Sequence, residues 1–255
     1  MKRRSLLAAA AAAAVFTAAP AIAAPVYSVG TGATYRPFEF QAPSKEIVGF
    51  DIDLMKEIAK AAGFQVKFQN TLWGVIFESV KNGDRDIIMS GITITDKRKQ
   101  VVDFSKPYFL AHQLILTDKS VKINKLSDLS KGSVAVVSGS AGDVAASKAF
   151  GKASTRIRRF DNTPLALEEL NQGGVVAAIG DIGVLAFYAR NNPDKHFNMT
   201  RDPAFEEQYF GIAVKKGNQK LIDKINAGLE KVIASGEYNK IYRKWFGTDA
   251  PKLPQ

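Results

Sequence analysis

Two stretches of this sequence repeat one order of secondary structure, namely strand, helix, strand, helix, strand, with short connections. In the first stretch, residues 51–62 place apolar side chains on one helical face, and Gly63 suits the left-handed end of that helix. This order is typical of a parallel, right-handed α/β sheet. We therefore predict an α/β protein of two lobes, each a mostly parallel sheet flanked by helices. The predicted elements are strands 26–31, 65–69 and 86–89 with helices 51–62 and 75–82, then strands 134–137, 156–160 and 175–179 with helices 143–150 and 163–172.

The lobes are not separated by a low-complexity linker, so we expect strands to cross between them near 108–113 and 207–211. Those crossings return the end of the chain to the first lobe. The predicted division is lobe 1 at 24–110 and 209–255, and lobe 2 at 111–208. The other predicted segments are a loop at 32–45, single strands at 109–117 and 209–214, a short helix at 126–129, and helices at 182–190, 219–234 and 238–246.

The first 23 residues have the features of a signal peptide. A basic start at 2–4 precedes an alanine-rich apolar run, and Ala21-Ile22-Ala23 has the small-x-small pattern of a cleavage site, so we expect cleavage near Ala23. A membrane anchor is the competing interpretation, but the run is mostly alanine and is broken by Pro20. The chain has no cysteine and therefore no acceptor for a lipid. We expect an exported protein that is free in the periplasm and is not lipid-anchored.

The chain carries a formal net charge of +10, to which residues 2–4 contribute three units. The lysines are scattered, and the densest basic cluster, at 156–159, lacks interleaved stacking aromatics, so we expect a solvated surface and no nucleic-acid partner. The two histidines, His112 and His196, lie far apart without further ligand spacing around them. We expect no metal site and no cofactor.

Residues 89–108 follow a predicted buried strand and collect small and hydroxyl residues ahead of one arginine. Ser90 and Gly91 allow a close backbone approach, Thr93 offers a hydroxyl, and Arg98 offers a planar fork that suits a carboxylate. A small anion site is one interpretation of this stretch. The other is an ordinary helix start whose charges face water, and the stretch alone does not decide between them.

Three further features also allow two interpretations. The turn 139–142, which contains Ser140 and Ala141, follows a strand and opens a helix, so it could seat one carboxylate. Asp181 suits the N-cap of a helix, or it could be the counter-charge to an ammonium group. The aromatic residues Tyr35 and Trp73 could pack in the core or against a ligand, whereas Phe38 is expected in the core. A fourth pair is simpler, because Asp51 and Asp53 are interpreted as first-turn helix charges.

Five stretches occur together in an order that resembles one family, the exported solute-binding proteins of polar amino acid ABC transporters, and its glutamine-binding branch most closely. They are residues 35–40 (Tyr-Arg-Pro-Phe-Glu-Phe), 49–54 (Gly-Phe-Asp-Ile-Asp-Leu), 91–98, 103–108 and 236–247. The resemblance covers the whole chain after the signal. It implies a two-lobed clamp of the type II periplasmic binding protein fold, joined by two crossing strands, that binds one amino acid between its lobes.

The resemblance also implies roles for individual residues. Arg98 resembles the arginine that binds the ligand carboxylate, helped by the Thr93 hydroxyl and a backbone N–H at Ala141. Asp181 resembles the aspartate that binds the ligand ammonium group, together with the Gly91 carbonyl. Tyr35 and Trp73 fall where aromatic walls enclose the ligand side chain. The implied partners are a free amino acid and the membrane permease of an ABC transporter, and we expect a monomer.

The side-chain pocket departs from the family pattern. We expect it to contain Gly32, Ser90, Val137, Ser140 and Gly180. At Gly32, Val137 and Gly180 the glutamine branch has polar side chains, so a larger or less polar ligand than glutamine is equally compatible.

The alternative function is an exported enzyme on the same scaffold, of the cyclohexadienyl or arogenate dehydratase type. That chemistry needs a general acid, and the sequence alone places no spare carboxylate in the cleft besides Asp181. We therefore expect a binding protein and not an enzyme.

Overall fold

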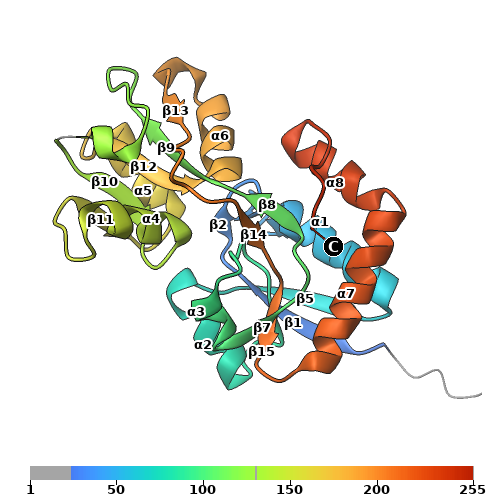
Figure 1. The fold of residues 1–255 in the computed structure, drawn as a ribbon. Coiled ribbons are helices and arrows are strands. Elements are labelled where there is room, and N and C mark those ends of the chain that lie inside the picture. Colours follow the sequence, from blue (N-terminus) through green and yellow to red (C-terminus); the bar gives the residue numbers. More distant parts are fainter. Residues whose placement is uncertain (1–23, 130, 255) are drawn as a thin grey trace, which may run out of the picture.

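The computed structural model describes residues 24–129 and 131–254, so the predicted signal peptide at 1–23 lies outside the described residues. It has two lobes, each a five-stranded sheet with helices packed against it (Figure 1). Two strands cross between the lobes near the middle of the molecule. Within the described ranges, no helix is both long and apolar enough to span a membrane.

The sheet of lobe 1 has the strand order β5-β1-β6-β15-β7. Only β15 runs antiparallel to its neighbours, β6 and β7, so the sheet is mostly parallel as predicted. The strands are β1 (Val26–Thr31), β5 (Gln65–Asn70), β6 (Ile87–Ile88), β7 (Val102–Phe104) and β15 (Ala213–Lys215).

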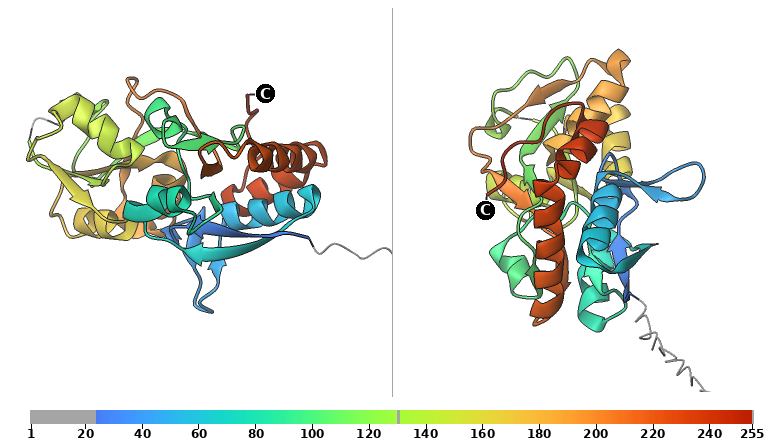
Figure 2. Two further views of the ribbon diagram at one scale, coloured as in Figure 1. Left: turned by 90° about the horizontal axis from the view of Figure 1, so that it is seen from below. Right: turned by 90° about the vertical axis from the view of Figure 1, so that its right-hand side faces the viewer.

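The helices of lobe 1 come from both ends of the described chain. Helix α1 (Phe50–Ala62) ends at Gly63 in the left-handed conformation, as predicted, and packs against α7 (Gln219–Ala234), beside which it lies in Figure 2. Helix α8 (Glu237–Phe246) contacts both and contributes Tyr242 and Phe246 to an aromatic cluster around Phe38 and Phe50. Phe38 is fully buried, which confirms its expected place in the core. The shorter helices are η1 (Trp73–Val75), α2 (Ile76–Asn82) and α3 (Asp96–Lys99).

The sheet of lobe 2 has the order β11-β10-β12-β9-β13, in which only β9 is antiparallel to its neighbours. Apolar runs such as that of β10 are typical of a parallel sheet covered on both faces. The strands are β9 (Gln113–Thr117), β10 (Val134–Val137), β11 (Ile157–Phe160), β12 (Ala177–Asp181) and β13 (Asn198–Thr200). The helices are η2 (Leu126–Asp128), α4 (Ala141–Phe150), α5 (Thr163–Asn171), α6 (Ile182–Asn191) and η3 (Pro193–Lys195).

The crossing strands are β8 (Phe109–Ala111) and β14 (Gln208–Phe210), which pair antiparallel with Phe109 opposite Phe210. Both predicted domain cuts, after residues 110 and 208, fall inside these strands. The division into 24–110 with 209–255 and 111–208 stays a prediction.

Three local predictions were wrong. The loop predicted at 32–45 contains β2 (Thr34–Tyr35) and β3 (Glu39–Gln41), which form a small sheet with β4 (Ile47–Val48). The single strand predicted at 109–117 is divided at His112 between the crossing pair and the sheet of lobe 2. The strand predicted at 209–214 is likewise divided, at Gly211, where a Cβ atom would lie 2.8 Å from Ile94 and 2.9 Å from Phe104.

Candidate functional site

A cavity of about 720 Å³ lies between the lobes. Its walls come from the carboxyl ends of β1 and β6 in lobe 1 and of β10 and β12 in lobe 2, which is where ligands bind in α/β sheets. All twelve residues that the sequence suggested for the site line this cavity. They are Gly32, Tyr35, Trp73, Ser90, Gly91, Thr93, Arg98, Val137, Ser140, Ala141, Gly180 and Asp181.

Arg98 is turned into the cavity and does not extend into water with its neighbours. The Thr95 hydroxyl caps α3 by accepting from the Arg98 backbone N–H at 3.2 Å. The guanidinium donates to the Thr93 carbonyl at 2.8 Å and, across the cleft, to the Gly139 carbonyl at 3.3 Å. Its Cζ lies 5.2 Å from the ring centre of Trp73. Burial lowers the pKa of Arg98 to about 10, so the side chain keeps its charge at neutral pH.

The start of α4 faces Arg98 from lobe 2. The Ser140 hydroxyl caps this helix by accepting from the Asp143 N–H, and the Asp143 carboxylate accepts from the Gly139 N–H at 3.0 Å. Among the described residues, no protein oxygen accepts from the N–H groups of Ala141 and Gly142. Free N–H groups at a helix start and a nearby guanidinium together make a seat for one carboxylate.

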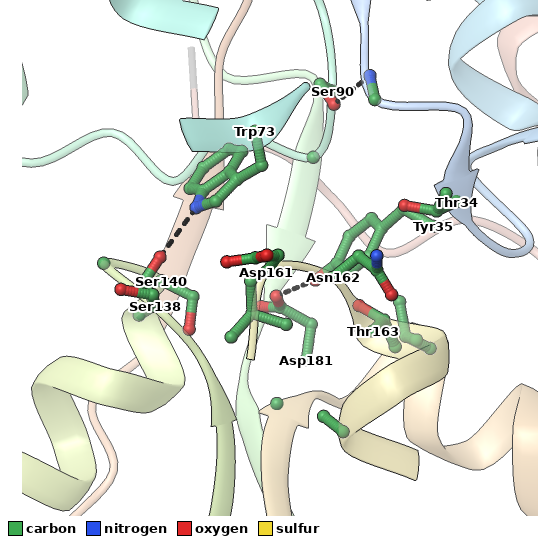
Figure 3. Close-up of a pocket in the computed structure, with 18 of the residues that line it drawn as sticks. Thr34, Tyr35, Trp73, Ser90, Ser138, Ser140, Asp161, Asn162, Thr163 and Asp181 are labelled. Atoms are coloured by element: carbon green, nitrogen blue, oxygen red, sulfur yellow. Dashed lines mark hydrogen bonds between the residues drawn. The ribbon is translucent and has the colours of Figure 1, made fainter. Parts of the chain in front are cut away.

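Asp181 occupies the N-cap position of α6, but its side chain makes no capping hydrogen bond. The carboxylate is 7% exposed and accepts from the Tyr35 hydroxyl across the cleft and from the Gln113 amide at 2.8 Å (Figure 3). Burial raises the pKa of Asp181 to about 6, so it is an anion at neutral pH. Burial, and then the nearby Asp181 charge, raise the pKa of Tyr35, so Tyr35 is the hydrogen donor of this pair.

Gly91 lies under the ring of Tyr35 and has a φ of 53°, in the left-handed region. A Cβ atom there would lie 2.6 Å from the Tyr35 ring, so no larger residue fits without moving that wall. The Gly91 N–H donates at 3.0 Å to the Asp51 carboxylate, which fixes the backbone at this point. Thr93, two residues further on, is buried.

Two buried acids hold this segment from behind. The Glu39 carboxyl accepts from the Ser90 hydroxyl at 2.7 Å, and Asp51 accepts from the Gly91 N–H and from the Tyr108 hydroxyl at 2.9 Å. Burial raises the pKa of Asp51 to about 6, and burial followed by the nearby Asp51 charge raises that of Glu39 well above its usual range. Two nearby buried carboxyls resist ionising together. Asp51 lies in the first turn of α1 as predicted, together with Asp53, but its side chain is fully buried and holds the Gly91 backbone.

Tyr35 and Trp73 both stand on the cavity wall. The indole N–H of Trp73 donates at 2.9 Å to the Ser138 carbonyl, at the end of β10 in lobe 2 (Figure 3). Trp73 is half-buried and so is Tyr35, which stacks on Phe38 behind it. A flat apolar surface from each side chain is thereby presented to the cavity.

The predicted side-chain pocket has no polar side chain at two of its positions, Gly180 and Val137. A Cβ atom at Gly180 would meet only Leu185, at 3.7 Å, so a side chain there has room. Val137 ends the apolar β10. A Cβ atom at Gly32 would lie 3.3 Å from the Ser90 hydroxyl, so this wall is tighter.

The sequence interpretation missed several polar residues of the wall, and the expectation of no spare carboxylate besides Asp181 was wrong. Glu39 and Asp161 both line the cavity. Asp161 directly follows β11, and its place at the carboxyl end of a predicted strand was a signal that could have found it. Glu39 gave no comparable signal, since it lies in a segment predicted to be a loop. The other missed polar residues are Thr34, Asn70, Ser138, Asn162 and Thr163.

Within the part of the chain that the structure describes, no three histidine, aspartate or glutamate side chains are grouped so that they could hold a metal ion. The cavity groups are instead those that bind a zwitterion. One cation, two helix-terminal N–H groups and one buried anion converge from two lobes.

Known proteins share this sequence and this fold. A model of the bacterial extracellular solute-binding proteins, family 3, matches residues 27–248. The chain is 43% identical over 225 residues to a probable histidine-binding protein of Neisseria gonorrhoeae, covering 88% of this chain and 84% of that protein. It is 38% identical over 219 residues to the ABC transporter glutamine-binding protein GlnH of Bacillus subtilis, covering 84% and 78%.

Among solved structures, the fold is similar to that of the arginine-, lysine-, histidine-binding protein ArtJ from Geobacillus stearothermophilus, with a TM-score of 0.84 and 41% identity over 89% of this chain and 96% of that chain. These similarities extend to proteins named for several amino acids. They do not single out the glutamine branch.

Proposed function

Since this chain belongs to family 3 of the bacterial extracellular solute-binding proteins, we propose that it captures one free amino acid between its lobes and delivers it to the membrane permease of an ABC transporter. The observation that carries the proposal is the convergence of Arg98 from lobe 1 and Asp181 from lobe 2 on one cavity. Similar proteins support it, because one is named as a glutamine-binding protein of an ABC transporter and another as an arginine-, lysine-, histidine-binding protein.

The site would hold the two charged ends of the ligand separately. Arg98 binds the α-carboxylate together with the N–H of Ala141 and the hydroxyl of Thr93. Asp181 binds the α-ammonium group together with the Gly91 carbonyl. Charge-assisted hydrogen bonds of this kind contribute roughly 1.5 to 3 kcal/mol each. Because the two charges stand on different lobes, the ligand stabilises the closed arrangement by its higher affinity for it.

Tyr35 and Trp73 would enclose the ligand side chain, and the pocket of Gly32, Ser90, Val137, Ser140 and Gly180 would surround its end. We propose that the protein acts as a monomer in the periplasm, after cleavage of the signal peptide near Ala23, and without a lipid anchor. The family is extracellular by its description.

The first test is a thermal-shift screen against the twenty amino acids. A ligand at one hundred times its dissociation constant stabilises the folded protein by about 2.7 kcal/mol, which raises the melting temperature by roughly 5 to 10 °C for a protein of this size. Arg98→Ala should then weaken the best ligand about 100-fold in calorimetry, because the carboxylate loses its cation. Lys97→Ala removes the neighbouring exposed cation and is the matched control.

A screen with no hit would refute the proposal. So would an Arg98→Ala variant that binds as the parent does.

A dehydratase needs a general acid, and the cavity wall contains two candidates besides Asp181, namely Glu39 and Asp161. Even so, the similar proteins are named for binding and not for catalysis. We expect no phenylpyruvate or phenylalanine when the protein is incubated with prephenate or arogenate. Formation of either product at a rate above that of a boiled sample would favour the enzyme.

A further inference from the structure

The charged groups on the cavity wall are unequal in number. Among the described residues that line it, Arg98 is the cation, and Glu39, Asp161 and Asp181 are the acids. Under the proposed function, the backbone of an amino acid uses Arg98 and Asp181, one against each of its own charges. Two carboxyl groups then remain for the side chain of the ligand.

Glu39 is poorly suited to receive a cation. It is fully buried and accepts from the Ser90 hydroxyl at 2.7 Å, and burial followed by the nearby Asp51 charge raises its pKa well above its usual range. Its role is to hold the segment that contains Ser90 and Gly91. Asp161 remains as the acid available to a ligand.

Asp161 is an exposed residue of the cavity wall, and no described residue donates a hydrogen bond to its carboxylate or forms an ion pair with it. The two nearest arginines along the chain are already paired, Arg158 with Glu169 and Arg159 with Asp143. In Figure 3, Asp161 lies among the side chains of the cavity, between Trp73 and Asp181 in the view. Its charge is therefore free for a ligand.

The sheet of lobe 2 sets the distance between the two acids. Asp181 ends β12, Asp161 follows β11, and β10 lies between these strands. Neighbouring strands are about 4.8 Å apart, so the two positions are separated by roughly 10 Å along the carboxyl edge of the sheet. The end of β10 lies between them, where Val137 gives a smooth floor and the Trp73 indole is fixed above by its bond to the Ser138 carbonyl.

We propose that Asp161 is the counter-charge for a guanidinium or ammonium group at the end of the ligand side chain, so that the site selects long cationic amino acids over neutral ones. This inference rests on the proposed function of the cavity. An ammonium on a four-carbon stem, or a guanidinium on a similar one, reaches from a backbone held at Asp181 toward Asp161. The aliphatic stem packs under Trp73, and a shorter side chain does not span the interval.

The rival possibility is that the cavity binds a neutral, apolar side chain. Part of its wall is apolar and includes Ala135, Ala166, Leu167 and Leu185. Leucine is therefore included in the test as the neutral rival.

The test is calorimetry with L-arginine, L-lysine, L-leucine and L-citrulline, which has nearly the shape of arginine but no side-chain charge. The parent protein should bind arginine at least about tenfold more tightly than citrulline. Asp161→Asn should weaken arginine about tenfold or more, leave citrulline within threefold and so remove the preference. Asp161→Glu should restore most of it, and Asp84→Asn, at an exposed aspartate elsewhere in lobe 1, should change neither.

The outcomes separate the two proposals. If the parent protein binds leucine or citrulline as tightly as arginine, or if Asp161→Asn keeps the full preference for arginine, the role of Asp161 is refuted and the proposed function stands. If the parent protein binds none of the twenty amino acids, the proposed function fails, and the inference fails with it.

Discussion

Replacing Asp181 by asparagine should weaken ligand binding and at the same time stabilise the unliganded protein. Asparagine has nearly the same size, its Oδ1 can accept from the Gln113 amide, and its Nδ2 can donate to the Tyr35 hydroxyl oxygen, so the packing around position 181 is kept. It lacks the charge that would hold the ligand ammonium group. We expect the affinity for the ligand to fall by about 10- to 150-fold, the equivalent of 1.5 to 3 kcal/mol.

The gain in stability follows from the pKa of Asp181, which burial raises from 3.8 to about 6. A carboxyl group whose pKa is raised on folding destabilises the folded state when it is ionised. A pKa that is higher by one in the folded protein than in the unfolded chain corresponds to about 1.36 kcal/mol, so ionised Asp181 lowers the free energy of unfolding by up to about 3 kcal/mol above pH 6. The penalty shrinks as the pH falls from 6 toward 4, because the folded protein then takes up the proton first.

Urea denaturation of both proteins at pH 7.5 and pH 4.5 measures this effect. The asparagine variant should be the more stable protein at pH 7.5, and most of the difference should disappear at pH 4.5. Asp51 is common to both proteins. The Asp181 charge helps to raise the pKa of Glu39, so its removal relieves Glu39 as well and adds to the gain in stability at pH 7.5. Asp84→Asn, at an exposed site, should show neither effect. Equal stability at pH 7.5, a difference that does not depend on pH, or retained affinity would refute this account of Asp181.

Two glycines give further expectations. Gly91→Ala places a methyl group 2.6 Å from the Tyr35 ring, at a residue with a left-handed φ. The free energy of unfolding should therefore fall by at least about 1 to 2 kcal/mol, and ligand affinity should fall with it. Gly74→Ala is the control, because its methyl group would meet open space and should not disturb the fold. Gly183→Ala places a methyl group of lobe 2 2.9 Å from Phe38 of lobe 1, so small-angle scattering without ligand should give a larger radius of gyration; an unchanged radius would show that Phe38 yields instead.

The sequence predicted the cavity well because its residues follow strands. Apolar runs such as 134–137 and 175–179 announce buried parallel strands, and a residue just past such a run must lie at the carboxyl edge of the sheet. Asp181 was found in this way, whereas Arg98 lies in α3, ten residues beyond β6. The resemblance to a family implied the roles of both residues, and their hydrogen bonds show that neither is an ordinary surface charge or helix cap.

The features that were missed depend on contacts between distant segments. Nothing near Asp51 indicates that its carboxyl would be buried with that of Glu39 and would hold the backbone of Gly91. The strands end at His112 and Gly211 because the chain passes there between the crossing pair, β8 and β14, and one of the two large sheets. The local sequence does not show which sheet a strand residue will join.

The position of β15 in the first sheet has a consequence for the order of assembly. This strand comes from residues 213–215, yet it lies between β6 and β7 and pairs with both. All of lobe 2 is synthesised before it, so lobe 2 can be complete while the sheet of lobe 1 still lacks one of its inner strands. When β15 inserts, the chain that leaves lobe 2 through β14 is tied beside the chain that enters through β8. Completion of the first lobe thus fixes both ends of the second.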